Sequence, residues 1–448
     1  MTEADKPAGK VRYSIVAMLF LASMVNYGDR SVLSIAAPAL SQEMNIDAVQ
    51  LGFVFSAFGW AYVLAQIPGG WLLDRFGSFR VYFWSILLWS IMTAAQGLLP
   101  WMAGMSAVGL LFTFRFLVGL AEAPAFPGNA RIVATWFPAT ERGTASAIFN
   151  SSQYFATVAF APIFGWLVHT TTWYSVFWFM GIVGVVLCFA WPRFMYEPRK
   201  HPRLGEAELQ KIIDGGGAVD MDSHGGSQKI AWSTVRVMLT NRTSVGVYIG
   251  QYAINTLTYF FITWFPVYLV KERGLSIIQA GAFATVPAIC GFAGGVLGGI
   301  WSDWMLRQGK SLTFARKTPI VAGMLGSLAI LGCNYSDSPW EVMVFMSLAF
   351  FGKGVGALGW AVMADTAPRG MAGISGGIFN TCGNLSSIVT PIAVGLLVSL
   401  TGGFAAALVF VAANALLAVA AFLFIVGDIR RIELPTPAAA AAGPTPGT

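Results

Sequence analysis

Long apolar stretches alternate with short polar breaks along nearly the whole chain of 448 residues. A helix needs about 20 mainly apolar residues to cross a bilayer. Cutting the chain at polar residues, glycines and prolines leaves twelve stretches of this kind, so we predict twelve transmembrane helices. Their approximate ranges are 13–40, 51–73, 79–99, 104–126, 143–168, 173–194, 243–270, 277–301, 318–334, 340–364, 371–399 and 404–426.

The composition agrees with a membrane protein. Hydrophobic residues make up 56% of the chain and charged residues 11%, and the mean hydropathy is +0.66. Soluble domains contain about 25% charged residues, and a soluble fold could not hide this much apolar surface. We therefore expect an all-α integral membrane protein in a lipid bilayer.

The net charge of +6 does not point to nucleic acid, because Lys and Arg are confined to short loops. Basic residues gather in the loops of one side, whereas Lys271 and Arg273 are the main exceptions on the other. By the positive-inside rule, both termini and the central polar stretch lie in the cytoplasm. The basic residues assigned to that side are Arg75, Arg80, Arg142, Arg307, Lys317, Arg369, Arg430 and Arg431.

One long polar stretch, residues 195–242, divides the chain. It predicts a short surface helix around 204–213 and then a Gly-rich flexible linker. The expected organisation is an N-terminal six-helix bundle at 1–194, a cytoplasmic linker at 195–242, a C-terminal six-helix bundle at 243–430 and a disordered tail at 431–448. The tail is predicted from its Pro, Ala, Gly and Thr composition.

The two halves contain an internal repeat. The Gly-x-x-x-Asp pattern of 70–74 recurs at 299–303, and the Pro, Gly and Ile-Phe-Asn positions of 138–150 recur at 368–380. Several matches in nearly one register indicate two parallel bundles related by an axis along the membrane normal.

Four ionisable residues lie in the middle of predicted helices: Asp29 and Arg30 in the first, Arg115 and Glu122 in the fourth. A charge at the bilayer centre costs roughly 2.5–3.5 kcal/mol and usually marks an ion or substrate pathway. Arg115 and Glu122 share one helix face but are about 10.5 Å apart, so each needs a partner on another helix. We predict that Glu122 faces Arg30 and Asp29 faces Arg115, in a network that binds and releases a proton. Purely structural ion pairs are the alternative.

The loop after the second predicted helix, 70–77, carries Asp74 and Arg75. It resembles the G-x-x-x-D-R-x-G signature of the major facilitator superfamily. Its second-half repeat keeps Asp303 but has Trp304 where an Arg would be expected. We predict that Asp74 holds a basic residue or a helix N-terminus of a neighbouring helix, so that these residues act in gating and not in substrate binding.

Longer motifs resemble the anion:cation symporter family of the major facilitators, and within it the bacterial glucarate/galactarate transporters. The resemblance covers nearly the whole chain and implies the major facilitator fold. The matching stretches are 26–30, 115–122, 136–138, 141–143, 149–154, 261–268, 351–354 and 358–365.

The resemblance implies proton-coupled import of sugar-acid anions, with glucarate or galactarate first, by alternating access in the bacterial inner membrane. It implies no cofactor besides the coupling protons. In such transporters the positions of Asp29 and Glu122 carry the protons, and a further set of positions contacts the sugar acid. That set is Tyr27, Arg30, Tyr62, Gln153, Trp360 and Asn380.

The residue types are chemically suited to these roles. The forked guanidinium of Arg30 can hold a carboxylate through two bonds, and the amides of Gln153 and Asn380 can donate to and accept from hydroxyls. Ordinary interhelical hydrogen bonds are the alternative for the two amides, and core packing is the alternative for the three aromatic residues.

Lys353, between two glycines in the tenth predicted helix, is a fifth membrane charge. A dicarboxylate has a second end to hold, and Lys353 is the candidate cation in the C-terminal half. The alternative is a salt bridge with Asp365 or another neighbour.

No nucleotide-binding loop or catalytic triad is evident, so we do not expect an enzyme. The four cysteines lack metal-ligand spacing, and His169, His201 and His224 lie at helix ends or in loops, which disfavours a histidine proton relay. We expect a monomer. Two alternatives stay open: a symporter of galactonate, a hexuronate or another organic anion, and a membrane sensor without turnover.

Overall fold

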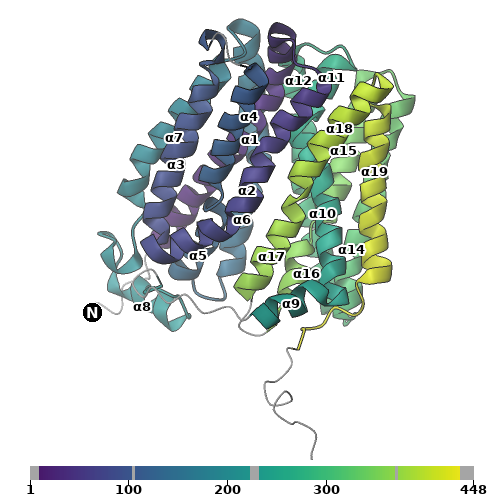
Figure 1. Ribbon diagram of the computed structural model, residues 1–448. Coiled ribbons are helices and arrows are strands. Elements are labelled where there is room, and N and C mark those ends of the chain that lie inside the picture. Colours follow the sequence, from purple (N-terminus) through teal and green to yellow (C-terminus); the bar gives the residue numbers. More distant parts are fainter. Residues whose placement is uncertain (1–9, 103–105, 222–231, 369–371, 434–448) are drawn as a thin grey trace, which may run out of the picture.

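The computed structural model describes residues 10–102, 106–221, 232–368 and 372–433, and this part of the chain is helical and without strands (Figure 1). The first half contains α1 (Val11–Met44), α2 (Ala48–Phe76), α3 (Ser78–Gln96), α4 (Ala107–Glu122), α5 (Ala125–Trp136), α6 (Arg142–Thr170) and α7 (Ser175–Phe194). Two short helices follow, α8 (Glu206–Asp214) and α9 (Trp232–Thr240). The second half contains α10 (Arg242–Thr263), α11 (Phe265–Lys271), α12 (Ile277–Phe283), α13 (Thr285–Arg307), α14 (Leu312–Gly326), α15 (Pro339–Val355), α16 (Gly359–Thr366), α17 (Ala372–Asn384), α18 (Ser386–Thr401) and α19 (Ala405–Ala420).

Within the described residues, nine helical segments are long and apolar enough to cross a membrane, and α10 with α11 forms a tenth that is bent by 50°. The helices α3 and α6 run beside these segments (Figure 1). The prediction of an all-α membrane protein is confirmed, while the total of twelve spans stays a prediction.

The fourth membrane segment is longer than predicted. We placed its end near residue 126, but α5 continues the segment to Trp136. Proline is tolerated at a helix N-cap and in the first turn, where the backbone N–H has no intrahelical partner. Pro124 is the N-cap of α5 and Pro127 lies in its first turn, so these prolines start a helix and do not end the segment.

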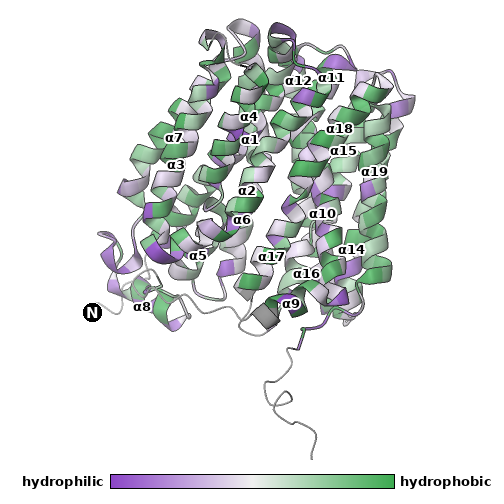
Figure 2. Ribbon diagram, in the orientation of Figure 1, coloured by the Kyte–Doolittle hydropathy of each residue, from purple (hydrophilic) through white to green (hydrophobic). Residues whose placement is uncertain are grey.

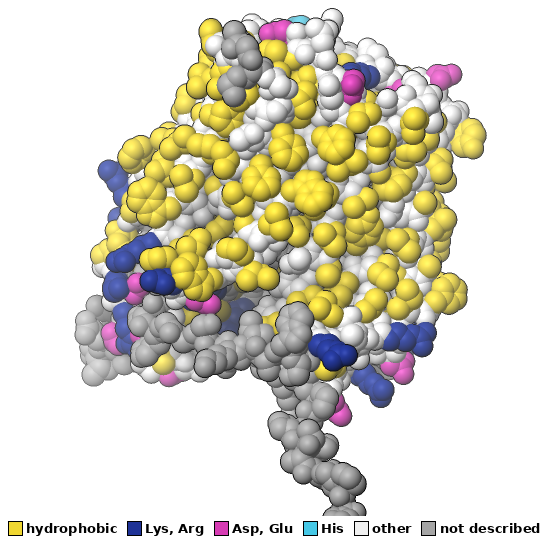
Figure 3. Space-filling view, viewed as in Figure 1, with side chains coloured by type: hydrophobic (Ala, Val, Ile, Leu, Met, Phe, Trp, Pro, Cys, Tyr) yellow, Lys and Arg dark blue, Asp and Glu magenta, His cyan; other side chains and the backbone are white. Residues whose placement is uncertain are grey.

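The surface of the molecule has a wide apolar band. Hydrophobic residues cover the flanks of the helices, whereas many Lys and Arg side chains gather near the end that carries α8 and α9 (Figures 2 and 3). A bilayer can cover such a band, because lipid tails are as apolar as these side chains. Large exposed hydrophobic side chains include Ile67, Trp84, Ile182, Phe189, Ile300, Leu400 and Phe424.

The two halves pack closely at the end of the molecule opposite α8, called here the far end. A Cβ added to Gly52 of α2 would lie 2.6 Å from the carbonyl oxygen of Pro391 in α18. A Cβ added to Gly281 of α12 would lie 2.5 Å from the carbonyl oxygen of Ala161 in α6. Only glycine permits such backbone approach, so the far end is closed.

At the opposite end of the molecule, called here the α8 end, glycines of the described part of α2 and α17 lie in open space. A Cβ added to Gly70 near the end of α2, or to Gly373 or Gly377 in α17, would meet no atom within 4 Å. The two halves therefore meet at the far end and leave these helix surfaces free at the α8 end.

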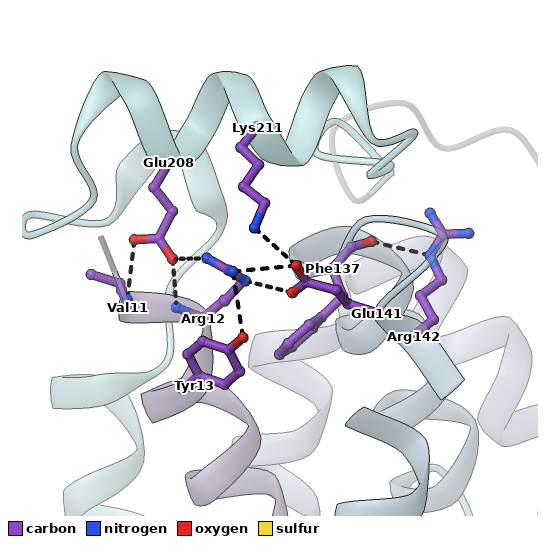
Figure 4. Close-up of polar contacts among 8 residues, drawn as sticks. All are labelled: Val11, Arg12, Tyr13, Phe137, Glu141, Arg142, Glu208 and Lys211. Atoms are coloured by element: carbon purple, nitrogen blue, oxygen red, sulfur yellow. Dashed lines mark hydrogen bonds and ion pairs between the residues drawn. The ribbon is translucent and has the colours of Figure 1, made fainter. Parts of the chain in front are cut away.

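The short helix α8 is attached to the first half by a network of charges (Figure 4). The fully buried Glu208 accepts hydrogen bonds from the backbone N–H groups of Val11 and Arg12, at 3.1 and 3.2 Å, and from Arg12 Nη1 at 2.9 Å. Arg12 Nε and Lys211 Nζ both donate to Glu141, at 2.8 and 2.9 Å. A carboxylate at a helix N-terminus satisfies free N–H groups and interacts favourably with the helix dipole.

The chain after α8 also packs against the first half. Ala139 N donates to Gly215 O at 2.8 Å, and Ala218 N donates to Ala134 O at 3.0 Å. The predicted surface helix is thus α8, but residues 215–221, which we expected to be part of a flexible linker, are held by hydrogen bonds. Residues 222–231, Arg369 and the tail from 434 onward lie outside the described residues.

Candidate functional site

Arg30 lies in the middle of α1, only 6% exposed, inside a cage of aromatic rings. Its guanidinium carbon is 4.9 Å from the centroid of Tyr27, 4.6 Å from that of Phe58 and 4.9 Å from that of Tyr62. Its Nε donates to Glu122 Oε2 at 3.0 Å. The predicted pairing of Arg30 with Glu122 is therefore present, and the rings stabilise the cation further.

The other end of the Arg30 guanidinium has no partner. Within the described residues Nη1 and Nη2 make no hydrogen bond, and neither atom is fully shielded from solvent. A planar guanidinium can hold a carboxylate through two parallel N–H···O bonds. Arg30 is thus oriented by Glu122 and the rings while its outer donors stay available.

Arg115 and Asp29 match the prediction only in part. Arg115, 2% exposed, donates from Nη1 to the main-chain oxygen of Asp29 at 2.9 Å and from Nη2 to that of Arg30 at 3.4 Å. It makes no hydrogen bond to the Asp29 carboxylate, whose side chain lies beside Thr93 of α3. Arg115 thus faces Asp29 as predicted, but it binds the main-chain oxygen of Asp29, and the two side chains form no ion pair among the described contacts.

Two carboxyl groups of the first half are completely buried and incompletely bonded. Both carboxylate oxygens of Asp29 and the Oε1 atom of Glu122 have no hydrogen-bond partner among the described residues. An ionised carboxylate in such a setting is costly, and a bound proton removes the charge. Asp29 and Glu122 are therefore chemically suited to carry protons.

The remaining predicted contact residues come from both halves. Gln153 of α6 is half-buried and donates from Nε2 to the main-chain oxygen of Asn150 at 3.2 Å. Asn380 of α17 donates to Gln66 Oε1 of α2 at 3.4 Å. Trp360 of α16 is 42% exposed and packs edge-on against Phe379, at 4.9 Å between ring centroids. Asn380 thus forms a hydrogen bond between the halves.

The second half contains a row of polar side chains that we did not predict. Gln251 Nε2 donates to Asn255 Oδ1 at 3.1 Å, and the hydroxyl of Tyr259 donates to Asn384 Oδ1 at 2.6 Å. Asn384 Nδ2 in turn donates to Asn380 Oδ1 at 3.0 Å. Residues 251, 255 and 259 are four apart and share one face of α10, so helical spacing was the signal that could have found them.

Lys353 of α15 is 4% exposed and forms no ion pair with a described residue. Its Nζ lies 5.2 Å from the ring centroid of Phe350 and 5.5 Å from that of Tyr154. The alternative of a salt bridge with Asp365 is not realised, because Arg316 of α14 pairs with that carboxylate at 2.9 Å.

The predicted gating residues form ion pairs at the α8 end. Asp74 of α2 pairs with Arg131 of α5, which also donates to Ser78 Oγ at 3.2 Å. In the second half Asp303 of α13 lies 3.6 Å from Arg316 Nη1. Asp74 thus binds a basic residue of a nearby helix, as predicted, and its repeat equivalent Asp303 also lies near one.

The third gating candidate, Arg75, is exposed and lies over the rings of Trp71 and Phe76, at 5.2 and 5.6 Å. No group of three His, Cys, Asp or Glu side chains in the described part of the chain could hold a metal ion.

Comparisons with known proteins agree with this architecture. Residues 19–391 match the family model of the Major Facilitator Superfamily. The "Probable galactarate/D-glucarate transporter" of Escherichia coli (strain K12) is 58% identical over 427 residues, covering 94% of this chain and 95% of that protein. A protein of the same name from Bacillus subtilis (strain 168) is 57% identical over 433 residues, covering 96% and 95%.

Solved structures show the same fold. The crystal structure of a D-xylose–proton symporter superposes with a TM-score of 0.71 at 16% sequence identity, covering 93% of this chain and 98% of that one. The relatives are named as transporters and not as enzymes. With a family match over most of its length and relatives more than half identical along nearly all of it, this multi-pass membrane protein belongs to the major facilitator superfamily.

Proposed function

We propose that the protein imports the sugar diacids D-glucarate and galactarate across the bacterial inner membrane, coupled to protons. The observation that carries the proposal is Arg30, whose inner edge is fixed by Glu122 and three rings while its outer donors are open. The relatives named as galactarate/D-glucarate transporters supply the substrate class.

In this proposal one carboxylate of the substrate binds the two Nη atoms of Arg30. The hydroxyl groups of the sugar chain bond to the amides of Gln153 and Asn380, which lie in different halves. Tyr27 and Tyr62 enclose the carboxylate end, and the exposed face of Trp360 packs against the carbon chain. Amides suit hydroxyls because each amide both donates and accepts.

Proton coupling follows from competition for one cation. Glu122 and the substrate carboxylate both need the charge of Arg30, which Glu122 holds at 3.0 Å. When Glu122 binds a proton, it no longer neutralises the charge of Arg30, and the open Nη atoms then bind the substrate carboxylate more strongly. Asp29 is the second proton carrier, and Arg115 positions it by fixing the backbone of α1.

Transport requires the site to open to each side in turn. The far end is closed by glycine contacts, and the α8 end is free of them. We assign the α8 end to the cytoplasm because basic side chains gather there (Figure 3), so the conformation is inward-facing. The ion pairs of Asp74, beside Arg75, and of Asp303 stabilise the ends of the two halves as these rock about the site.

We further propose that the units of this motion are the bundles 1–194 and 243–430, joined by the cytoplasmic linker 195–242. The start of the tail predicted at 431–448 is attached to the second half, since Ile432 N donates to Thr366 O at 2.9 Å, and the tail from 434 onward lies outside the described residues. The protein works as a monomer, because each monomer contains a complete site. Protons serve as the coupling ion, without a cofactor.

Uptake of labelled D-glucarate into proteoliposomes, with and without a pH gradient, tests the proposal. Accumulation that needs an acidic exterior is the expected result. Accumulation of galactonate or a hexuronate in place of D-glucarate would change the substrate, and accumulation without a gradient requirement would exclude proton coupling. Binding without any uptake would identify a sensor.

A further inference from the structure

The second half contains a buried cation without a counter-ion. Lys353 is 4% exposed, and no acidic side chain of the described residues pairs with it. Its Nζ lies over the rings of Phe350 and Tyr154. A buried unpaired charge is strongly destabilising, so its presence calls for a use that the protein's own residues do not supply.

The acids of the surrounding helices are already bound. Asp365, one helix further along, and Asp303 both interact with Arg316, at 2.9 and 3.6 Å. On the first half, Glu122 is paired with Arg30, and the unpaired Asp29 forms no ion pair with Lys353. Within the described residues Lys353 therefore has no counter-charge, and a bound anion can supply one.

Lys353 lies beside the proposed substrate site. Tyr154, whose ring faces its Nζ, follows Gln153 in α6, and both line a small cavity together with Phe350 and Thr258. The hydroxyl of Thr258 is buried and has no hydrogen-bond partner among the described residues. The cavity between α6, α10 and α15 thus joins a proposed substrate contact, Gln153, to the ring contacts of the lysine.

Both cations lie against tyrosines of the first half. The guanidinium carbon of Arg30 is 4.9 Å from the ring centroid of Tyr27 in α1. The Nζ of Lys353 is 5.5 Å from the ring centroid of Tyr154 in α6, a helix that packs against α1. Lys353 of the second half therefore reaches the helix pair of the first half that contains Arg30 and Gln153.

We infer that Lys353 binds the second carboxylate of a dicarboxylic sugar acid, and this inference rests on the proposed function, in which Arg30 binds the first. A six-carbon diacid carries a negative charge at each end and so satisfies both cations. A monoacid of the same length has a neutral hydroxymethyl group at one end and leaves Lys353 without a counter-charge. A site with a buried polar group rejects ligands that leave the group unpaired, so Lys353 selects dianions.

The test compares two sugar acids that differ at one end. Dissociation constants for D-glucarate and D-gluconate are measured by competition on the purified full-length protein, in the wild type and in Lys353→Gln. We expect the preference for D-glucarate over D-gluconate to fall by about tenfold or more, the range for losing a hydrogen bond to a charged group. Lys353→Arg, which keeps the charge, is expected to retain most of the preference, and Lys310→Gln serves as an exposed control.

A structural role for the lysine predicts different results. Equal weakening of both acids in Lys353→Gln, or an unchanged preference, would overturn the inference. The melting temperature without ligand adds a second readout: it is expected to rise by about 2 °C or more when the unpaired charge is removed, and a fall would assign Lys353 to structure. Failure of the proposed function itself is recognised separately, since the wild type would then bind neither acid.

Discussion

The backbone contact between Gly52 and Pro391 offers a direct way to shift the conformation. In Gly52→Ala the new methyl group would lie 2.6 Å from the carbonyl oxygen of Pro391, 3.3 Å from its carbonyl carbon and 3.4 Å from Ile392 Cα. All three are backbone atoms, which cannot rotate away as a side chain can. The substitution therefore separates α2 from α18 at the far end.

The magnitude follows from the cost of overpacking, which is typically about 1–3 kcal/mol. This cost applies only to the conformation in which the far end is closed, because α2 and α18 do not touch once that end opens. Since 1.4 kcal/mol corresponds to tenfold, the ratio of far-end-closed to far-end-open molecules should fall by a factor of about 5 to 150. Substrate affinity at Arg30 should change much less.

Spin labels at Gln42 and Thr401, on exposed positions of α1 and α18, would report the separation of the halves by pulsed electron spin resonance. We expect a short distance in the wild type and a larger share of long distances in Gly52→Ala. Gly70→Ala is the matched control, because it lies on the same helix with no atom within 4 Å of its added methyl group. An unchanged distance distribution in folded Gly52→Ala protein would refute the reasoning.

Three further predictions address the charges. Glu122→Gln should abolish proton-driven accumulation but preserve exchange of substrate, since the amide mimics the protonated acid; normal accumulation in proteoliposomes would remove Glu122 from the proton pathway. Arg30→Lys should lose most substrate affinity although the charge remains, because the two-bond geometry is lost; a titration within about twofold of wild type, roughly 0.4 kcal/mol, would make Arg30 structural. Hydrogen bonds from Arg12 and Lys211 lower the pKa of Glu141 below its ordinary 4.5. Its contribution to stability is therefore complete above pH 4.5 and lost as the pH falls through the lowered pKa. The difference in melting temperature between wild type and Glu141→Gln should accordingly shrink on acidification from pH 7, and a constant difference would contradict this account.

The pairing of Arg30 with Glu122 could be predicted from the sequence. The contact of Arg115 with the main chain at Asp29 could not. A membrane charge has few possible partners, because the membrane helices contain few other charges. The seven-residue spacing of Arg115 and Glu122 also puts both side chains on the same face of their helix. The side chain of Arg115, however, can reach either a carboxylate or a main-chain carbonyl. Which one it reaches depends on the rotation of α1 against α4, and helical periodicity does not specify this rotation.

The amide row of the second half shows a related limit. Gln251, Asn255 and Tyr259 were visible at helical spacing, but a polar stripe on one helix does not reveal which helix it faces. The structure pairs Tyr259 with Asn384 of α17, a contact across 125 residues of sequence. Long-range partners of this kind are set by how helices pack, and small residues allow several packings.

The charges and the amides are distributed unequally between the two halves. Asp29, Arg30, Arg115 and Glu122 all lie on α1 and α4, whereas the polar row of the second half and Lys353 lie on α10, α15 and α17. In the proposed mechanism the first half therefore contains both proton carriers together with the cation for the first carboxylate, while the second half adds Trp360, Asn380 and Lys353 to the substrate site. Mutations at these three positions can change the preferred substrate while Asp29, Glu122 and Arg30 stay as they are. A new substrate preference can then evolve without loss of proton coupling at the intermediate stages.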